Sequence, residues 1–377
     1  MPILFLATVA ILIYVVVGYP LLLGALARRF ARPVHKAPFF HPVTVIVPAY
    51  NGENFLADKL RSILNLDYPR DLLEVIVVSD GSTDRTEAIA QGFSSAGVKL
   101  LALPRGGKPA ALNAAIPQAS GEILLLTDVR QILAPDSLKL LTQCFADPAV
   151  GVVSGELIIR SGESHAEADI GLYWRIESRI RAQLGSIDSI FGATGPFYCI
   201  RRELAVPIPP DILLDDMYMP LAAFFRGYRL IVESRAQAYD YPTSLATEFR
   251  RKVRTLGGNY QILLAYPQLL GPKNRMWFHF VSYKFGRLML PWLLMATAIS
   301  SFGLPYPWRL PILAAQSCFY LLAALDTLIP AASPLKRVSS PSKTFVIMMI
   351  AAIRGLAVFF VPARSLWKVT SATKIDP

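Results

Sequence analysis

The sequence is poor in cysteine, histidine and charged residues. Its 377 residues include three cysteines and four histidines, and charged residues make up 17% of the chain. Cys144, Cys199 and Cys318 lie far apart and form no CxxC pair. This pattern argues against a disulfide framework and against a cysteine-based zinc site. The patterns GxxxxGK[ST] and GxGxxG are also absent, which excludes two common phosphate-binding loops.

Long apolar runs, by contrast, are abundant. Hydrophobic residues make up 53% of the chain, and residues 3–26 carry no charge. A run of this length suffices to cross a bilayer, which takes roughly 20 residues. We interpret it as an anchor rather than a signal peptide, because it is longer than a signal h-region and no basic segment precedes it. Further apolar runs cover residues 286–303, 308–330 and 343–361.

The net charge of +11 is concentrated beside these runs. Basic residues follow the first run at Arg28, Arg29, Arg32 and Lys36, and two more occupy positions 336–337. The positive-inside rule predicts that these flanks are cytoplasmic. We therefore expect an integral protein of the plasma (inner) membrane with its large domain in the cytoplasm. The bilayer accounts for the basic excess, so no nucleic-acid partner is expected.

The middle of the chain alternates between two patterns. Apolar segments typical of buried strands are followed by helix-like segments at about 53–66, after Thr83, at 109–118 and at about 135–146. The strand-like segments are residues 43–47, 74–78, 98–103 and 122–126. This alternation predicts an α/β domain whose mostly parallel sheet is covered on both faces. Ligands of such sheets bind outside the carboxyl ends of the strands.

Polar residues follow each predicted strand, at 48–53, 79–82, 105–108 and 127–130. Glycines among them let the backbone approach a ligand closely. Lys108 and Arg130 supply positive charge, and Asp128 supplies an acceptor for a metal or a hydroxyl group. This mixture suits a nucleotide carrying a diphosphate. Simpler roles stay open: a helix cap for Asn51, a turn residue for Asp80 and a solvated surface position for Lys108.

Six segments share their order and spacing with one enzyme family. They are VTVIVPAYNGE, VIVVSDGSTDRT, GGKPAALNAA, ILLLTDVR, GATGPFYCIRREL and ILLDDMYMPLAAFFRGYRL, followed by EFRRKVRTLGGNYQ at 248–261. Together they resemble family 2 glycosyltransferases with a GT-A fold. The membrane arrangement resembles the branch that contains the cellulose, chitin and hyaluronan synthases.

The resemblance implies a nucleotide-sugar donor and an inverting transfer. It assigns the nucleoside to Asp80 and to four residues that precede it in the chain, Ala49, Tyr50, Asn51 and Glu53. It places Lys108 near the diphosphate. Asp128 matches the first acid of the DxD motif, which holds the diphosphate through a divalent cation, Mg or Mn. Asp216 matches the last acid of the TED-type motif, the general base. The remaining donor residues that it implies are Arg251 and Arg254.

The chain departs from the family pattern at two motifs. Arg130 stands where DxD has its second acid, so it either neutralises phosphate directly or leaves the metal with fewer ligands. The QxxRW motif reads Arg251-Lys252-Val253-Arg254-Thr255. Its tryptophan is replaced by Thr255, so a single transfer and polymer synthesis both stay open.

The resemblance also implies residues on the acceptor side. The segment that lines acceptor sites in the family contains Glu156 and Trp174, although Trp174 could instead pack in the core. Asp215 either supports Asp216 or caps a helix.

Four regions are predicted along the chain. They are an anchor at 1–30, a GT-A domain at 40–245, an amphipathic region at 246–275 and transmembrane or re-entrant helices at 276–363. The amphipathic region carries an apolar stripe that lies either in the membrane interface or against the core. The stripe consists of Phe249, Val253, Leu256, Tyr260 and Leu263.

The leading hypothesis is a membrane-embedded glycosyltransferase that moves a sugar from a UDP-linked donor to a saccharide or lipid acceptor at the cytosolic face. Partner subunits for polymer export are compatible with it. One alternative is a polyprenyl-phosphate or ceramide-type glycosyltransferase. Another is a non-catalytic membrane subunit that binds a nucleotide sugar.

Overall fold

The computed structural model describes residues 1–159, 165–240, 245–330 and 333–366. The chain divides into two compact units, which we treat separately. We call residues 27–160 and 181–242 the sheet unit. Residues 1–26, 161–180 and 243–370 form the helical unit.

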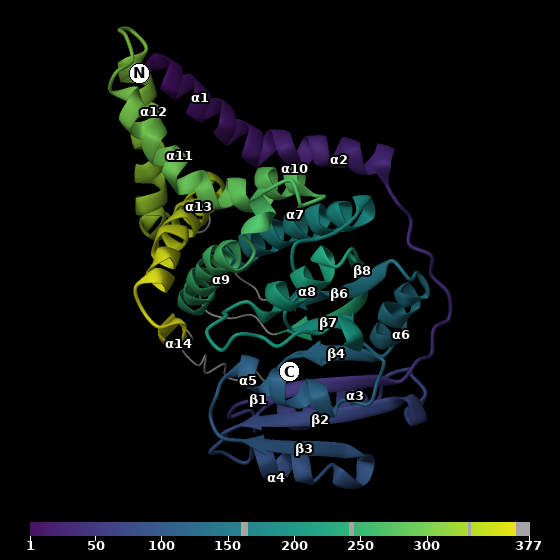
Figure 1. The fold of residues 1–377 in the computed structure, drawn as a ribbon. Helices are drawn as coiled ribbons and strands as arrows, with labels where there is room; N and C mark the ends of the chain where they lie inside the picture. The colour runs from purple at the N-terminus through teal and green to yellow at the C-terminus, as the bar shows by residue number, and fades with distance from the viewer. Residues whose placement is uncertain (160–164, 241–244, 331–332, 367–377) are drawn as a thin grey trace. The chain divides into compact units, whose positions relative to one another are not determined.

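The sheet unit contains one eight-stranded sheet with the order β3-β2-β1-β4-β7-β6-β8-β5 (Figure 1). The strands are β1 Val43–Ala49, β2 Leu73–Asp80, β3 Val98–Leu103, β4 Ile123–Thr127, β5 Ile132–Leu133, β6 Val150–Ile159, β7 Phe197–Arg201 and β8 Arg229–Asp240.

The first four strands are parallel to one another, as the alternation of strands and helices predicts. β1 pairs with β2 from Val43 opposite Leu73 to Ala49 opposite Ser79, so the two strands end at the same level. The other half of the sheet is mixed, because β7 runs antiparallel to both β4 and β6. The α/β prediction with a mostly parallel sheet is confirmed.

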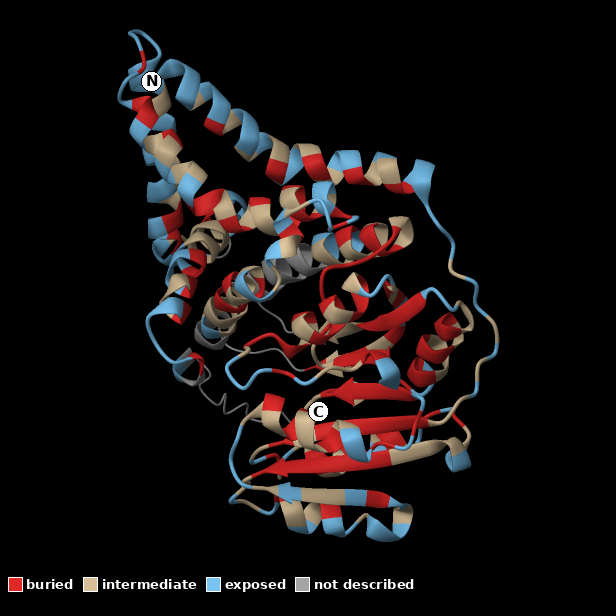
Figure 2. Ribbon diagram, in the orientation of Figure 1, coloured by how far each residue is buried: buried red, intermediate tan, exposed pale blue. Residues whose placement is uncertain are grey.

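Short helices cover the sheet of this unit. They are α3 Leu56–Leu64, α4 Thr86–Gln91, α5 Lys108–Ala115, α6 Ser137–Thr142 and α8 Asp215–Phe225. α7, His165–Ile187, ends in this unit. The apolar residues of α3 and α6 form a buried cluster with alternate residues of β1 and β2, including Val45 and Val77. Figure 2 shows the central strands as the most continuously buried part of the sheet unit.

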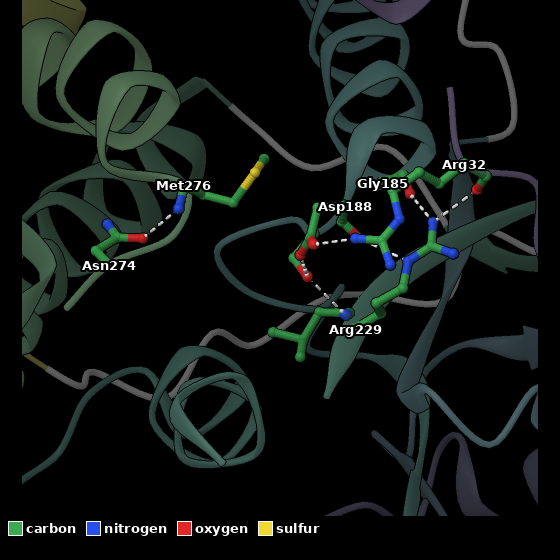
Figure 3. A network of polar contacts seen from close by, with 8 residues as sticks. Arg32, Gly185, Asp188, Arg229, Asn274 and Met276 are labelled. Atoms are coloured by element: carbon green, nitrogen blue, oxygen red, sulfur yellow. Dashed lines mark hydrogen bonds and ion pairs between the residues drawn. The ribbon is translucent and has the colours of Figure 1, made fainter. Parts of the chain in front are cut away.

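The segment that follows the first apolar run is bound to the sheet unit by an arginine network (Figure 3). Arg229 donates hydrogen bonds to the carbonyl oxygens of Arg32 and Gly185, at 2.9 and 3.1 Å. The Arg32 guanidinium forms a 3.0 Å ion pair with Asp188. Arg229 also donates to the Asp188 carbonyl oxygen at 3.2 Å. Because Arg229 is buried, these three carbonyl contacts are shielded from water. The basic flank of the first run is thus part of the sheet unit's structure.

The helical unit contains the apolar runs. Its elements are α1 Pro2–Ile13, a π-helical turn Tyr14–Gly18, α2 Tyr19–Phe30, α9 Leu245–Ala265, α10 Trp277–Phe280, a second π-helical turn Val281–Phe285, α11 Gly286–Ser301, α12 Arg309–Leu325, α13 Lys336–Gly355 and α14 Ala363–Leu366. α1 packs against α11, and α13 packs against both α9 and α12.

The Arg354-Gly355 pair within the apolar segment of α13 lies against α9, where Gly355 meets Gly257 and Arg354 meets Phe249. A Cβ at Gly355 would lie 2.8 Å from the Gly257 nitrogen of α9, so only glycine permits this approach of the two backbones. The Arg354 guanidinium lies 5.7 Å from the centre of the Phe249 ring on α9. Tyr260, also on the predicted stripe, is buried with its ring beside that of Phe359. Part of the stripe therefore packs against the C-terminal helices.

Within the described residues, three helices are long and apolar enough to cross a membrane. They cover Pro2–Phe30, Arg309–Leu328 and Lys336–Phe359, by length and composition alone. They match three of the four predicted runs. The fourth, at 286–303, forms the 16-residue α11 and does not meet the same criterion. The transmembrane or re-entrant arrangement of residues 276–363 stays a prediction.

Candidate functional site

The carboxyl ends of the parallel strands place the predicted residues along one rim of the sheet. Ala49, Asp80 and Thr127 are the last residues of β1, β2 and β4. Ala49 and Thr127 are almost fully buried, so they shape the rim from below. Asp128 directly follows β4. The rim has two halves, which differ in how their carboxylates are held.

The first half, which we call the base half, is centred on Asp80. Its carboxylate is 3% exposed and accepts hydrogen bonds from the backbone nitrogens of Gly106, at 2.7 Å, and Gly107, at 2.9 Å. The Arg105 guanidinium pairs with the same carboxylate and lies 3.6 Å from the centre of the Tyr50 ring. A flat cation stacked on an aromatic ring marks a place where a flat base can also stack.

A glycine makes this arrangement possible. Gly81 has a φ of +67°, and a Cβ there would lie 2.7 Å from the Arg105 nitrogen. Any other residue would therefore push the loop after β3 away from Asp80. The Asp-Gly pair at the end of β2 is explained by this close approach.

Asn51 and Glu53 brace the loops beside Asp80. Asn51 has a φ of +48°, and its side-chain oxygen accepts a 2.8 Å hydrogen bond from the Thr83 nitrogen. Glu53 forms a 3.3 Å ion pair with Arg85, and its own nitrogen donates to Asp84 at 3.0 Å. Both side chains thus tie the loop after β1 to the loop after β2. Direct contact of either residue with a nucleoside stays a prediction.

The second half, which we call the transfer half, is centred on Lys108. Its ammonium lies 2.9 Å from an oxygen of Asp128 and 3.1 Å from an oxygen of Asp215. Burial alone would lower the pKa of Lys108, but the carboxylates of Asp128, Asp215 and Asp216 outweigh it and raise the pKa well above its ordinary value. Lys108 is therefore a permanent cation between β4 and α8.

Asp215 and Asp216 form the first turn of α8, and Leu214 rather than either acid holds the N-cap position. Asp215 is buried, whereas Asp216 is half-buried. A Cβ at Gly195 would lie 2.5 Å from an oxygen of Asp216, so this carboxylate rests on the glycine backbone. The Asp216 carbonyl oxygen also accepts a 2.8 Å hydrogen bond from the Ala193 nitrogen. The loop at 192–196 thus fixes the Asp216 side chain from one side.

Arg130 has a partner that sequence analysis did not foresee. Its guanidinium pairs with the almost fully buried Asp240 at the end of β8. The Gln131 side chain donates to the same carboxylate at 2.9 Å. This pairing favours a structural role for Arg130, and its contact with phosphate stays a prediction.

Two buried residues beneath the transfer half were not among those predicted from the sequence. Lys59 of α3 is 0% exposed; burial lowers its pKa to about 7, although the carboxylates of Asp128 and Asp240 oppose that effect. Tyr198 of β7 is also fully buried, and burial followed by nearby carboxylates raises its pKa. Lys59 had a sequence signal, because it falls on the apolar stripe of Leu56, Leu60 and Ile63. No sequence signal pointed to Tyr198, since it lies within an apolar strand.

The remaining predicted residues lie elsewhere. Glu156 is on β6, half-buried and opposite Gln237 of β8. Arg251 and Arg254 are on α9 of the helical unit. The side chain of Trp174 lies outside the described part of the chain. The roles of all four in binding donor or acceptor stay predictions.

Comparison with known proteins agrees with this geometry. The sequence pattern of the family described as "Glycosyl transferase family 2" matches residues 44–206. The chain carries a family 2 glycosyltransferase domain. The prediction of a glycosyltransferase with a GT-A fold is thereby confirmed. The matched residues include Asp80, Lys108 and Asp128 but end before Asp216.

Curated relatives that match this chain have different names. An N-acetylglucosaminyltransferase of Rhizobium leguminosarum bv. viciae is 28% identical, over 71% of this chain and 67% of its own length. A beta-monoglucosyldiacylglycerol synthase of Nostoc sp. is 28% identical, over 69% of this chain and 59% of its own length. The chain thus spans about two thirds of these relatives or less.

A solved structure resembles almost the whole chain. It is the mannosyltransferase PcManGT from Pyrobaculum calidifontis in complex with GDP-Man and Mn²⁺. The identity is 25% and the TM-score is 0.70. The match covers 94% of this chain and 99% of that one. The similarity therefore extends beyond the family 2 domain.

Proposed function

We propose that the protein is a membrane-bound inverting glycosyltransferase that takes a sugar from a UDP-linked donor at the cytosolic face of the inner membrane. One observation carries the proposal. Lys108, Asp128, Asp215 and Asp216 come from three separate segments, and they surround one point at the carboxyl edge of the sheet. In parallel α/β sheets this edge is where ligands bind.

The base half suits the nucleoside of the donor. A uracil base stacked near Tyr50 would bring its N–H within reach of Asp80, which accepts hydrogen bonds and donates none when ionised. Arg105 occupies this place in the structure, so we expect its side chain to move when a nucleotide binds. The diphosphate would then extend towards Lys108.

A divalent cation fits the transfer half if it arrives with the donor. Among the described residues no group of three or more His, Cys, Asp or Glu side chains could hold a metal by itself. Mg²⁺ and similar ions, however, often bind one or two carboxylates together with substrate phosphates. Asp128 is the carboxylate in position to do this, and such a cation would neutralise charge on the leaving diphosphate. The similar PcManGT structure is a complex with GDP-Man and Mn²⁺.

The residues of the transfer half suit an inverting displacement. Asp216 would take the proton of the acceptor hydroxyl as its oxygen attacks the anomeric carbon. The bond from that carbon to the diphosphate breaks on the opposite face, which inverts the configuration. Lys108 stays protonated and would stabilise the negative charge that develops on the leaving diphosphate. Asp215 holds Lys108 in place.

The acceptor is proposed to be a saccharide or a lipid that reaches the site from the membrane. In the described part of the chain three helices are apolar enough to span a bilayer. The relatives include both an N-acetylglucosaminyltransferase and a beta-monoglucosyldiacylglycerol synthase. We assign acceptor contacts to Glu156 and Trp174, and donor contacts to Arg251 and Arg254. We also propose that the protein works with partner subunits if its product is a polymer that is exported.

The test is a donor panel with the full-length protein in detergent or nanodiscs. Released nucleoside diphosphate is measured for UDP-glucose, UDP-N-acetylglucosamine and GDP-mannose, with and without EDTA. We expect slow hydrolysis of one UDP-sugar, and its loss when EDTA removes the cation. Turnover of GDP-mannose alone would contradict the choice of uridine. Binding of a nucleotide sugar without any turnover would favour the non-catalytic subunit. Absence of both binding and turnover for every nucleotide sugar would contradict the proposal.

A further inference from the structure

Lys59 is a buried lysine with two hydrogen bonds to one turn of the chain. Its ammonium donates to the Thr127 hydroxyl at 2.6 Å and to the Gln131 carbonyl oxygen at 2.7 Å. Thr127 and Gln131 are four residues apart, and Asp128 and Arg130 lie between them. A side chain of α3 thus joins the beginning and the end of the turn that carries Asp128.

The same turn is fixed from two other directions. The Thr127 hydroxyl donates to the Pro196 carbonyl oxygen at 2.8 Å, which connects the turn to the loop that supports Asp216. At its far end, Arg130 and Gln131 both bind Asp240. Thr127 connects the two sides of this network, because its hydroxyl accepts a hydrogen bond from Lys59 and donates one to the Pro196 carbonyl oxygen.

A lysine at this buried position costs free energy, because its amino group loses hydration on folding. Its side chain is 0% exposed, and an apolar residue of similar length would avoid the loss of hydration. Burying a polar group is tolerated when it is fully hydrogen-bonded, and here both bonds go to the turn. A neutral amine has two N–H donors, so the connection does not depend on the charge of Lys59. The position therefore uses hydrogen bonding that methionine or leucine cannot supply.

We propose that Lys59 is a positioning residue that holds the Asp128 turn in the geometry required to bind the donor diphosphate. This inference rests on the proposed function, because it assumes that a diphosphate binds at Asp128. Residues that hold a metal-binding side chain in place without touching the metal typically contribute roughly 10- to 100-fold to metal affinity or activity. Asp128 is proposed to bind the diphosphate through such a cation. The nucleoside binds in the base half, so Lys59 should leave nucleoside affinity unchanged.

The experiment compares uridine with UDP on the full-length protein, by calorimetry in the presence of MnCl₂. For Lys59→Met we expect UDP affinity to fall by roughly 10- to 100-fold. Uridine affinity should stay within about twofold of the wild-type value, because the hydrogen bonds of Lys59 go to Thr127 and Gln131 in the transfer half. Leu60→Ala is the matched control: the residue adjoins Lys59 on α3 and is equally buried, but it packs in the apolar cluster. It should lower the melting temperature and change neither affinity by more than about twofold.

Thr127→Val is the second variant, in case Lys59→Met does not fold. It removes the hydroxyl that accepts from Lys59 and keeps the size of the side chain, so the same selective loss of UDP affinity is expected. Wild-type UDP affinity in a folded Lys59→Met protein would overturn the inference. An equal loss of uridine and UDP affinity would do the same, because it would indicate a general structural defect. A wild-type protein that binds no UDP would remove the proposed function, and this inference with it.

Discussion

The two halves of the rim hold their carboxylates in different ways. In the base half, Asp80 is bound by the backbone nitrogens of two consecutive glycines and by the adjacent Arg105. In the transfer half, Asp128 and Asp215 meet through Lys108, and more than 80 positions separate the two acids along the chain. The first arrangement needs only two neighbouring loops, whereas the second needs the whole sheet unit to fold.

This difference separates binding from chemistry. A carboxylate held by fixed backbone donors suits recognition of a nucleoside, whose contacts stay the same throughout the reaction. A protonated lysine among several carboxylates suits a step in which charge moves. Changes in the base half should therefore alter the affinity for the nucleoside, and changes in the transfer half should alter the affinity for the diphosphate or the turnover.

The largest effect is expected for Asp216→Asn. Removing a general base typically slows turnover by roughly 10²- to 10⁴-fold. UDP affinity should stay within about twofold, since asparagine keeps the shape that rests on Gly195. Initial rates of sugar transfer and UDP titrations measure the two quantities. Turnover near the wild-type level would show that another group takes the proton.

A smaller effect is expected for Lys108→Met. The variant keeps the length of the side chain and leaves Asp128 and Asp215 without their shared cation, so a diphosphate would be repelled. We expect UDP to bind roughly 10- to 100-fold more weakly, while uridine binds as before. Equilibrium dialysis with both ligands measures this. Equal weakening of both would mean that the two halves are not independent.

In the base half, Asp80→Asn should raise the KM for the donor by about tenfold. Asparagine retains one acceptor for the glycine nitrogens but loses the charge that pairs with Arg105. The kcat at saturating donor should be unchanged, because this side chain does not face the reacting atoms. A fall in kcat without a change in KM would reverse the roles assigned to the two halves.

The smallest effect on activity is expected far from the rim, at the opposite end of β2. Burial opposes ionisation of Glu74, but hydrogen bonds from Lys99, Thr44 and Ser120 outweigh it and lower its pKa to about 2. Its stabilising contribution is therefore present above the unfolded pKa of 4.5 and is lost as the pH falls towards 2. Glu74→Gln should lower the free energy of unfolding by roughly 1–3 kcal/mol at neutral pH, with kcat unchanged.

Thermal melts of the wild type and Glu74→Gln across pH provide the check. The difference in melting temperature should shrink as the pH falls below about 4. A constant difference down to about pH 3 would show that the Glu74 charge is not the source.

The base half could be predicted from sequence better than the transfer half. Apolar strands that end in polar, glycine-containing loops indicate a parallel sheet and its ligand-binding edge, and this predicted the positions of Asp80 and Asp128. The mixed half of the sheet could not be predicted in this way, because β7 pairs with β4 across about 70 intervening residues. Strand order of this kind depends on long-range packing rather than on local pattern.

The least predictable features are buried polar partners. Arg130 invited an assignment to phosphate, yet its guanidinium pairs with Asp240, which is 110 positions away. Lys59 resembles an ordinary charged residue of a surface helix until its position on the apolar stripe is noticed. The pairing of Arg130 with Asp240 and the hydrogen bonds of Lys59 cannot be identified from the sequence. They form only when the fold brings β8 and α3 beside the turn after β4.

The most direct test of the central claim is a structure of the Asp216→Asn variant with its UDP-sugar donor bound. We expect uracil beside Tyr50 and Asp80, the diphosphate at Lys108 and Asp128, and the anomeric carbon facing residue 216. A nucleotide bound at any other surface, or a sugar that faces away from residue 216, would contradict it.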